Sequence, residues 1–322
     1  QESILSNRSW ILSMDPSLRW DDGPNTLPSM HPTEVLFQNK RQPLLLPACD
    51  HYAGSEKLMR KSMALQQELG PVFDITFDCE DGAVAGSEQE HALLVANLIN
   101  SEDNRFDRIG VRVHDVNSPH FEHDIETIVG NAAARIAYVV VPKTESLEDA
   151  ARAADVIHAR AVRAGRSHMP VHILIETHGA LRDAYAIAAL PAVESLSFGI
   201  MDFVSAHYGA IPGAAMRTPG QFTHPLIVRA KLEIAAACHA HGKVPSHNVT
   251  TEIKDSAVVA NDAQRAAAEF GFTRMWSIHP DQVKPILKAF TPRLSEVAEA
   301  TAILQEAMAV GWGPIAQHGR LH

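Results

Sequence analysis

The segments "HILIETHGAL" (residues 172–181) and "VESLSFGIMDF" (residues 193–203) give the strongest indication of how this chain folds. Each contains a short apolar run of the kind that forms a buried strand, and each run is followed by one acid, Glu176 or Asp202. An acid at the tip of a buried strand is costly unless a positive group meets it. Both carboxylates therefore require a cationic partner or a shared cation.

The same pattern recurs eight times along the chain. A short apolar run ends in polar residues, and a segment with apolar residues at helical spacing follows. The residues that end the runs are Pro47, Glu80, Arg112, Lys143, Glu176, Asp202, His247 and His279. Five of the seven steps between them are 31 to 33 residues long. This repeat is typical of a (β/α)8 TIM barrel, in which active sites lie at the C-terminal ends of the strands.

An open, doubly wound α/β sheet is the competing fold. It would normally place a glycine-rich phosphate turn after its first strand, and no such turn is present. We therefore expect an N-terminal extension over residues 1–40, a barrel over residues 41–290, and a C-terminal helix followed by a lid or arm over residues 291–322.

Composition and charge narrow the functional classes. The net charge of −10 argues against the basic face that nucleic acid requires. The three cysteines are far apart and form no CxxC pair, so neither a zinc site nor a disulfide framework is predicted. No apolar run approaches the roughly 18 residues that a membrane span needs, and the first 20 residues do not resemble a signal peptide. We expect a cytoplasmic protein.

Glu176 and Asp202 are the predicted metal ligands. Strands five and six of a barrel are neighbours, so the two carboxylates should stand side by side and repel each other unless a cation lies between them. Oxygen ligands of this kind, completed by substrate and water, suit Mg²⁺. The alternative is that one acid caps a helix and the other forms a salt bridge.

Arg112 and Lys143 are the predicted cations of the same site. Arg112 could bind a carboxylate or stabilise an oxyanion, or it could merely pair with Glu80 or Asp81. Both roles are compatible if Glu80 orients Arg112. Lys143 could form a Schiff base, but beside a metal site we expect a structural or electrostatic role.

The segment around Gly199 suggests how a substrate carboxylate could be held. Gly199 permits close approach of the backbone, and the amides of Met201 and Asp202 could hold that carboxylate. A 2-oxo acid could then chelate Mg²⁺ through its keto and carboxylate oxygens. We expect His279 to be structural and Cys79 to be a small core residue.

Several of these motifs together resemble a known family. They are "FDCEDGA", "VRVHD", "VVVPKTES", "ILIETHGAL", "SFGIMDF" and "SIHPDQVKPILKAFTPRLSEVAEA". In this order, from about Leu44 to about Gly311, they resemble the citrate lyase beta-subunit-like group. That group includes malyl-CoA lyases, within the wider class of metal-dependent 2-oxo-acid aldolases.

The resemblance implies a TIM barrel, usually trimeric or hexameric, with Mg²⁺ held by Glu176 and Asp202. It implies that Arg112 contacts the 2-oxo acid and the enolate oxygen, and that Glu80 supports Arg112.

The partners implied are an acyl-CoA and a 2-oxo acid, with the CoA near the first βα loop. The candidates for contacting CoA phosphates there are Lys57, Arg60 and Lys61. The tail "QHGRLH" is similar to part of a lid segment that carries an aspartate in many such lyases, although that aspartate is not seen here.

The implied reaction is a reversible Claisen-type cleavage of a β-hydroxyacyl-CoA such as citryl-CoA or malyl-CoA. The general base is left open among Glu80, a water at the metal and a lid acid. The alternatives are an acyl-CoA thioesterase, a CoA-independent 2-oxo-acid aldolase, and a non-catalytic protein that binds a 2-oxo acid or an acyl-CoA.

Overall fold

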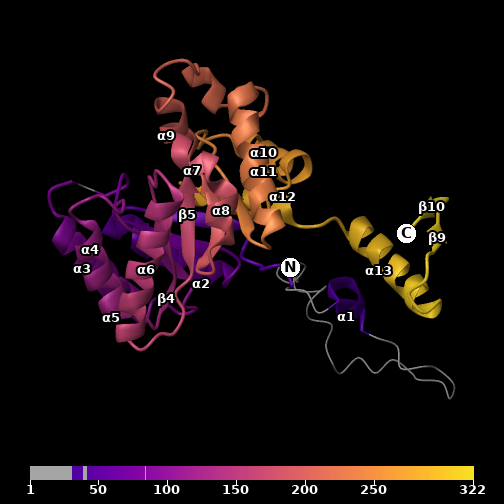
Figure 1. Ribbon diagram of the computed structural model, residues 1–322, viewed down its shortest axis with the longest axis horizontal. Coiled ribbons are helices and arrows are strands. Elements are labelled where there is room, and N and C mark those ends of the chain that lie inside the picture. The colour runs from indigo at the N-terminus through magenta and orange to yellow at the C-terminus, as the bar shows by residue number, and fades with distance from the viewer. Residues whose placement is uncertain (1–30, 39–41, 84) are drawn as a thin grey trace. The chain divides into compact units, whose positions relative to one another are not determined.

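The computed structural model describes residues 31–38, 42–83 and 85–322. The chain divides into two compact units (Figure 1). One is residues 44–290, and the other combines the segments 1–43 and 291–322. Most of the expected N-terminal extension lies outside the described residues.

The unit of residues 44–290 is a closed barrel of eight parallel strands. Each strand pairs with the next one along the chain, and β8 pairs with β1 to close the barrel. The strands are β1 (Cys49–Ala53), β2 (Asp74–Asp78), β3 (Ile109–Arg112), β4 (Ile136–Val141), β5 (Val171–Ile175), β6 (Val193–Phe198), β7 (Val244–His247) and β8 (Arg274–Ser277). The predicted TIM barrel is confirmed.

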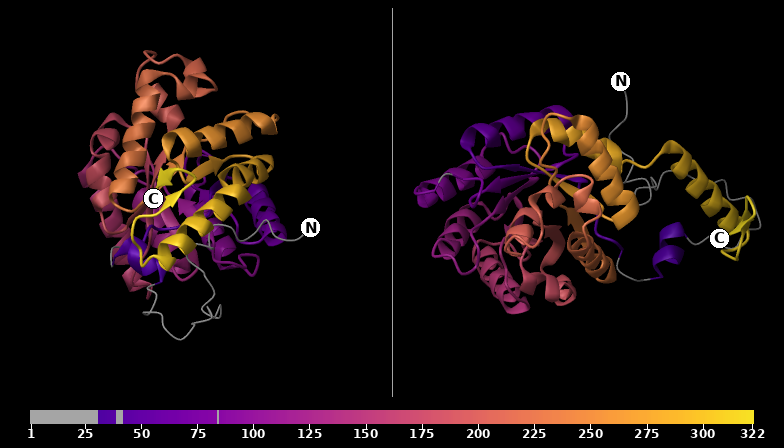
Figure 2. Two further views of the ribbon diagram at one scale, coloured as in Figure 1. Left: turned by 90° about the vertical axis from the view of Figure 1, so that its right-hand side faces the viewer. Right: turned by 90° about the horizontal axis from the view of Figure 1, so that it is seen from above.

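Helices between the strands surround this barrel (Figure 2). They are α2 (Glu56–Leu69), α3 (Glu88–Asn100), α4 (Phe121–Asp124), η2 (Ile125–Val129), α5 (Gly130–Ala132), α6 (Leu147–Arg163), α7 (His178–Arg182), α8 (Ala184–Ala189), α9 (Ile200–Ser205), η3 (Gly213–Met216), η4 (Gly220–Phe222), α10 (Pro225–Ala240), α11 (Ser256–Phe270) and α12 (Pro280–Phe290). In the described part of the chain, no helix has both the length and the apolar character that a membrane crossing requires.

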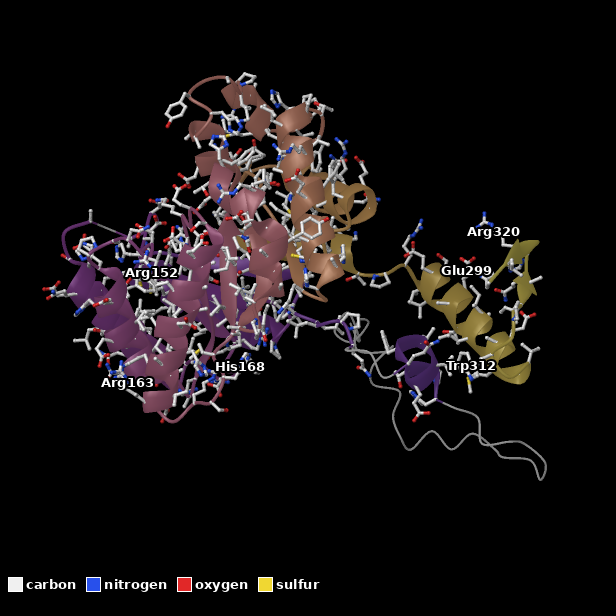
Figure 3. The ribbon with its side chains drawn as sticks, viewed as in Figure 1. Arg152, Arg163, His168, Glu299, Trp312 and Arg320 are labelled. Atoms are coloured by element: carbon white, nitrogen blue, oxygen red, sulfur yellow. The ribbon has the colours of Figure 1, made fainter. Side chains whose placement is uncertain are left out.

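Helix α6 illustrates how the sequence fixes these elements. The hydroxyl of Ser146 accepts a hydrogen bond from the amide of Asp149 and so caps the first turn. Ile157 is fully buried against the barrel, whereas Arg152 and Arg163 lie on the solvent side (Figure 3). The helix therefore has one apolar stripe, which packs on the strands.

The first strand differs from the sequence prediction. We expected it to be the apolar run "LLLPA", but residues 42–47 form no strand and β1 is the more polar segment Cys49–Ala53. The segment was misread because Asp50 and His51 are buried inside the strand. His51 Nδ1 lies 2.9 Å from Ser277 Oγ, and Asp50 Oδ2 lies 3.1 Å from Arg274 Nη2.

Arg274 is the centre of a buried polar network inside the barrel. Its guanidinium contacts Asp50 on β1 and Asp74 on β2, and it donates a hydrogen bond to Tyr138 Oη on β4 at 3.1 Å. Tyr138 Oη donates to Asp50 Oδ1 at 3.0 Å. Because all four side chains are buried, the two carboxylates and the guanidinium neutralise much of each other's charge away from water.

An apolar group lies in the same barrel interior. It consists of Tyr52, Tyr138, Val140, Leu174, Val249 and Trp276, with the rings of Tyr52 and Trp276 stacked 4.5 Å apart. A second and larger apolar layer fills the space between the strands and the helices. The barrel is therefore filled, and only its mouth remains for binding.

The second unit contains α1 (Pro32–Phe37), α13 (Leu294–Ala309) and a two-stranded antiparallel sheet of β9 (Ala316–Gln317) and β10 (Arg320–Leu321). Helix α13 lies in the segment 291–322, where we expected a C-terminal helix. The tail that we expected to be a lid or arm forms the small sheet, whose ends are joined by backbone hydrogen bonds between Ile315 and His322.

We predict that Arg274→Met lowers the free energy of unfolding by about 3–5 kcal/mol, because it leaves the buried carboxylate of Asp50 without its cation and Asp74 with Arg108 alone. Urea denaturation followed by circular dichroism measures the change. The control is Arg229→Met, which removes an exposed i,i+4 pair with Glu233 and should change stability by less than about 0.5 kcal/mol. Equal effects of the two substitutions would contradict the prediction.

Candidate active site

Glu176 and Asp202 lie at neighbouring strand ends. Glu176 directly follows β5, and Asp202 lies in the first turn of α9, which follows β6. These strands pair in parallel up to the partners Ile175 and Phe198, so both acids are at the C-terminal mouth of the barrel. Glu176 is only 2% exposed, whereas Asp202 is partly buried.

The protonation of Glu176 depends on its burial and on the neighbouring carboxylate of Asp202. Burial raises the pKa of Glu176 to about 8, and the negative charge of Asp202 adds to the effect. A hydrogen bond from the amide of Lys143 to Glu176 Oε1, 2.7 Å long, and the charge of Arg112 act in the opposite direction but do not cancel it. Without a further cation, Glu176 is thus largely protonated at neutral pH.

Gly199 is required by the position of Glu176. A Cβ atom added at Gly199 would lie 2.1 Å from Glu176 Oε2 and 2.6 Å from Glu176 Cβ. The close backbone approach expected from the sequence is therefore an approach to Glu176. Gly199 is also the N-cap of α9, so the amides of Met201 and Asp202 lie in its first turn, where they have no acceptor within the helix. The Met201 side chain is exposed.

Arg112, the last residue of β3, is held by two acids. Its Nε and Nη2 donate to the two oxygens of Asp78 at 2.7 and 2.5 Å, and its Nη1 lies 3.1 Å from Glu80 Oε2. Opposite charges on Asp78 and Glu80 outweigh burial and keep the pKa of Arg112 above its usual range. Asp78 thus fixes the Nε–Nη2 edge of the planar guanidinium, and Glu80 fixes its Nη1.

Asp78 is a residue of this cluster that sequence analysis missed. The sequence left open a pairing of Arg112 with Glu80 or Asp81; Glu80 does pair with it, but the bidentate partner is Asp78, and Asp81 pairs with Lys143. The available signal was strand register, because Asp78 and Arg112 are direct partners in the β2–β3 pairing. The amides of Glu80 and Gly82 in turn donate to Asp78 and fix its carboxylate.

Lys143 joins the two halves of the site. Its ammonium group contacts Glu80 Oε1 and lies 3.0 and 3.1 Å from the oxygens of Asp81, while its amide donates to Glu176. Burial would lower the pKa of Lys143, but its hydrogen bonds to Glu80 and Asp81 outweigh this and raise it. For Glu80 the balance is the reverse. Its burial raises its pKa by more than the charges of Arg112 and Lys143 lower it, so the pKa of Glu80 is raised.

The charge of this cluster suits a divalent cation. It contains five carboxylates and two cationic side chains, namely Asp78, Glu80, Asp81, Glu176, Asp202, Arg112 and Lys143. Fully ionised, it would carry a net charge of −3. Among the described residues no group of three or more His, Cys, Asp or Glu side chains could hold a metal. Glu176 and Asp202 would offer carboxylate oxygens, the kind of ligand that Mg²⁺ accepts together with water and substrate oxygens. This donor set fits Mg²⁺.

The other residues singled out from the sequence lie outside this cluster. His279 is half-buried, two residues beyond β8, and Cys79 is buried, with its pKa raised by burial. Lys57, Arg60 and Lys61 are exposed on α2, where Arg60 already pairs with Glu56 at 2.8 Å.

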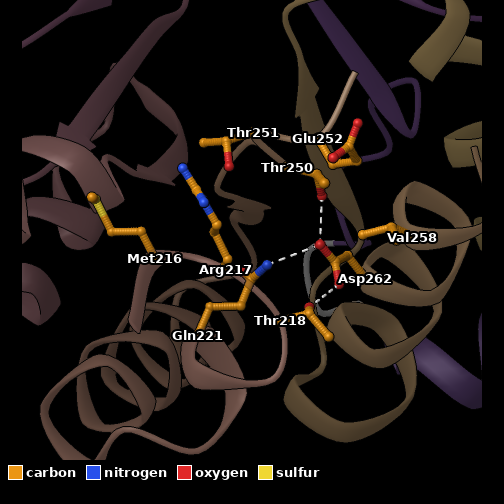
Figure 4. Close-up of a pocket in the computed structure, with 9 residues that line it drawn as sticks. All are labelled: Met216, Arg217, Thr218, Gln221, Thr250, Thr251, Glu252, Val258 and Asp262. Atoms are coloured by element: carbon orange, nitrogen blue, oxygen red, sulfur yellow. Dashed lines mark hydrogen bonds between the residues drawn. The ribbon is translucent and has the colours of Figure 1, made fainter. Parts of the chain in front are cut away.

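A separate cavity of about 380 Å³ lies between the connections that follow β6 and β7 (Figure 4). Its wall is fixed by Asp262, which accepts hydrogen bonds from Thr218, Gln221 and Thr250. None of its nine drawn lining residues belongs to the predicted site. The cavity and the Glu176–Asp202 pair are therefore lined by different residues.

Comparison with known proteins gives consistent matches. The model of the family described as HpcH/HpaI aldolase/citrate lyase matches residues 60–280. An L-malyl-CoA/beta-methylmalyl-CoA lyase of Cereibacter sphaeroides is 28% identical over 262 residues, covering 77% of this chain and 81% of the relative.

Two solved structures extend the comparison. The crystal structure of a citrate lyase from Burkholderia xenovorans LB400 has 59% sequence identity and a TM-score of 0.84, covering 88% of each chain. The protein CitE of Mycobacterium tuberculosis, in complex with magnesium, acetoacetate and coenzyme A, has 20% identity and a TM-score of 0.66, covering 88% of this chain and 93% of that one. At 20% identity the second likeness concerns the fold alone.

We predict that Glu176 makes the metal-free protein less stable as pH rises. The pKa of Glu176 in the folded protein, about 8, lies above its value in the unfolded chain. The stability that protonated Glu176 contributes is therefore fully present below about pH 4.5 and is lost as pH rises through 8. Urea unfolding in EDTA at pH 5 and pH 9 measures this effect. Relative to the wild type, the free energy of unfolding of Glu176→Gln should be higher at pH 9 than at pH 5, by at most about 5 kcal/mol. Glu233→Gln on α10 is the control. A pH-independent difference would contradict the raised pKa.

Proposed function

Because this chain belongs to the HpcH/HpaI aldolase/citrate lyase family, we propose that it is a Mg²⁺-dependent carbon–carbon lyase. Its substrate would be a β-hydroxyacyl-CoA such as citryl-CoA or malyl-CoA, cleaved to or formed from a 2-oxo acid and an acyl-CoA. The family match confirms the resemblance predicted from the motifs, and the named relatives are lyases. The observation that carries the proposal is the pair Glu176 and Asp202 beside Arg112.

The proposed metal ligands are Glu176 and Asp202. When bound there, Mg²⁺ would act as a Lewis acid on the carbonyl oxygen of the 2-oxo acid. The complex of the Mycobacterium tuberculosis protein with magnesium, acetoacetate and coenzyme A supports this choice of metal and the choice of a CoA partner. The first-turn amides of Met201 and Asp202, next to Gly199, would hold the carboxylate of the 2-oxo acid.

Arg112 would bind the substrate and stabilise negative charge on the enolate oxygen. Asp78 and Glu80 hold the guanidinium from the protein side, so no reorganisation is needed when that charge develops. Glu80 is also a candidate for the base that removes the β-hydroxyl proton, because its burial raises its pKa.

An assay of released products tests the reaction. We expect the protein to release a 2-oxo acid and an acyl-CoA from malyl-CoA or citryl-CoA with Mg²⁺ present, and nothing in EDTA. Glu176→Gln and Asp202→Asn should each lower the rate at least about 100-fold, since each removes a metal ligand. Asp155→Asn, an exposed acid on α6, is the control.

The outcomes separate the alternatives. Turnover that persists in EDTA would contradict the metal site. Release of free CoA rather than an acyl-CoA would identify a thioesterase, and cleavage of a free hydroxy-oxo acid alone would identify a CoA-independent aldolase. Binding of oxaloacetate without any release from either substrate class would identify a non-catalytic binding protein.

A second prediction concerns the shape of the Arg112 side chain. Arg112→Lys should lose at least about 100-fold in kcat/KM, because an ammonium group cannot meet Asp78 with two parallel hydrogen bonds while facing the ligand. The matched control is Arg108→Lys. Arg108 pairs with Asp74 at the opposite end of the same strand, so this variant should retain the wild-type rate. Wild-type turnover in the Arg112 variant would remove Arg112 from the mechanism.

We also propose that the protein assembles as a homo-oligomer, a trimer or a hexamer. The resemblance to the citrate lyase beta-subunit-like group is the support for this part of the proposal.

A further inference from the structure

We propose that Lys143 is a positioning residue with two separable roles. Its main-chain amide holds the carboxylate of Glu176 in place, and its ammonium group holds Glu80 against Arg112. The inference rests on the proposed function, because it concerns how the lyase site is arranged. The two roles use different atoms of one residue, which allows them to be tested independently.

The backbone conformation of Lys143 supports the first role. Its φ of 50° lies in the left-handed region, which residues other than glycine seldom adopt. In this conformation the amide points at Glu176 Oε1, 2.7 Å away. Glu176 is 2% exposed, so bulk water cannot replace that hydrogen bond. A strained backbone at this position is therefore explained by the carboxylate that it holds.

The contacts of the ammonium group support the second role. It contacts Glu80 Oε1, while Arg112 Nη1 lies 3.1 Å from the other oxygen, so Glu80 is held between two cations. Asp81 approaches the same ammonium group at 3.0 Å from the more exposed side. Removal of the ammonium group would free one oxygen of Glu80 and allow the Glu80–Arg112 pair to shift.

A covalent role does not fit this geometry. A Schiff base requires a neutral amine with a free lone pair. The ammonium group of Lys143 instead faces the carboxylates of Glu80 and Asp81, which favour its charged form. Lys143 is thus placed to orient other groups.

The choice of substitution separates the two roles. Lys143→Gly and Lys143→Asn remove the ammonium group but accept a left-handed backbone, so both should keep the amide on Glu176. Lys143→Val also removes the ammonium group, but its β-branched side chain opposes the left-handed conformation. Lys254→Gly, which removes an exposed lysine from the connection after β7, controls for the change in net charge.

Calorimetric titration of the metal-free protein with Mg²⁺ tests the first role, the hold of the Lys143 amide on Glu176. We expect the Gly and Asn variants to bind Mg²⁺ within about 3-fold of the wild type, and the Val variant to bind at least about 10-fold more weakly. Urea unfolding shows whether each variant is folded. Equal weakening in the Gly and Val variants would overturn the role of the amide, and so would a wild type that binds no Mg²⁺.

Titration of the Mg²⁺-loaded protein with oxaloacetate tests the second role, together with kcat/KM in the lyase assay. The affinity for oxaloacetate and kcat/KM should each fall at least about 10-fold in the Gly and Asn variants and stay unchanged in Lys254→Gly. Unchanged oxaloacetate binding in the folded Gly variant would overturn the role of the ammonium group. Failure of the lyase assay in the wild type would count against the proposed function alone, because the two titrations do not depend on turnover.

Discussion

The burial of the Glu176 carboxyl group next to the carboxylate of Asp202 is the constraint on which the rest of the site depends. Two adjacent strand ends bring the carboxylates together, and burial denies Glu176 the water that would screen its charge. The surrounding backbone is adapted to this pair. Lys143 takes a left-handed conformation to donate to Glu176, and position 199 can carry only a glycine hydrogen beside it. Both features place an ionisable group where a divalent cation could balance it.

The positive groups of the site, Arg112 and Lys143, are held by the acids Asp78, Glu80 and Asp81. From the barrel interior toward the surface, charges alternate through Asp78, Arg112, Glu80, Lys143 and Asp81. Each cation in this chain contacts two carboxylates, so neither can leave its position without exposing two negative charges to each other. This series of alternating charges therefore keeps the guanidinium in a fixed place beside the Glu176–Asp202 pair.

The sequence predicted the barrel and the positions of the main polar residues because both follow from a repeat that is visible along the chain. Glu176, Arg112 and Lys143 each end an apolar run, and the structure places each of them at the end of a strand. Contacts between distant segments were less accessible. The β1 strand was misplaced because Asp50 makes it look like a loop, and its partner Arg274 is far away in the sequence.

The left-handed backbone conformation of Lys143 could not be predicted from the sequence either. Glycine and asparagine are the usual signals for such a conformation, and neither is present at this position. The bidentate partner of Arg112 required the β2–β3 register, which motif spacing does not supply.

The position of Arg274 has a consequence for the order in which the chain can fold during synthesis. Asp50 leaves the ribosome about 220 residues before the Arg274 guanidinium that neutralises it, whereas Asp74 finds a first cation in the nearby Arg108. Until β8 is made, β1 would have to bury the carboxylate of Asp50 without its cation, which opposes early docking of that strand. The barrel interior is therefore completed only when β8 supplies the missing positive charge.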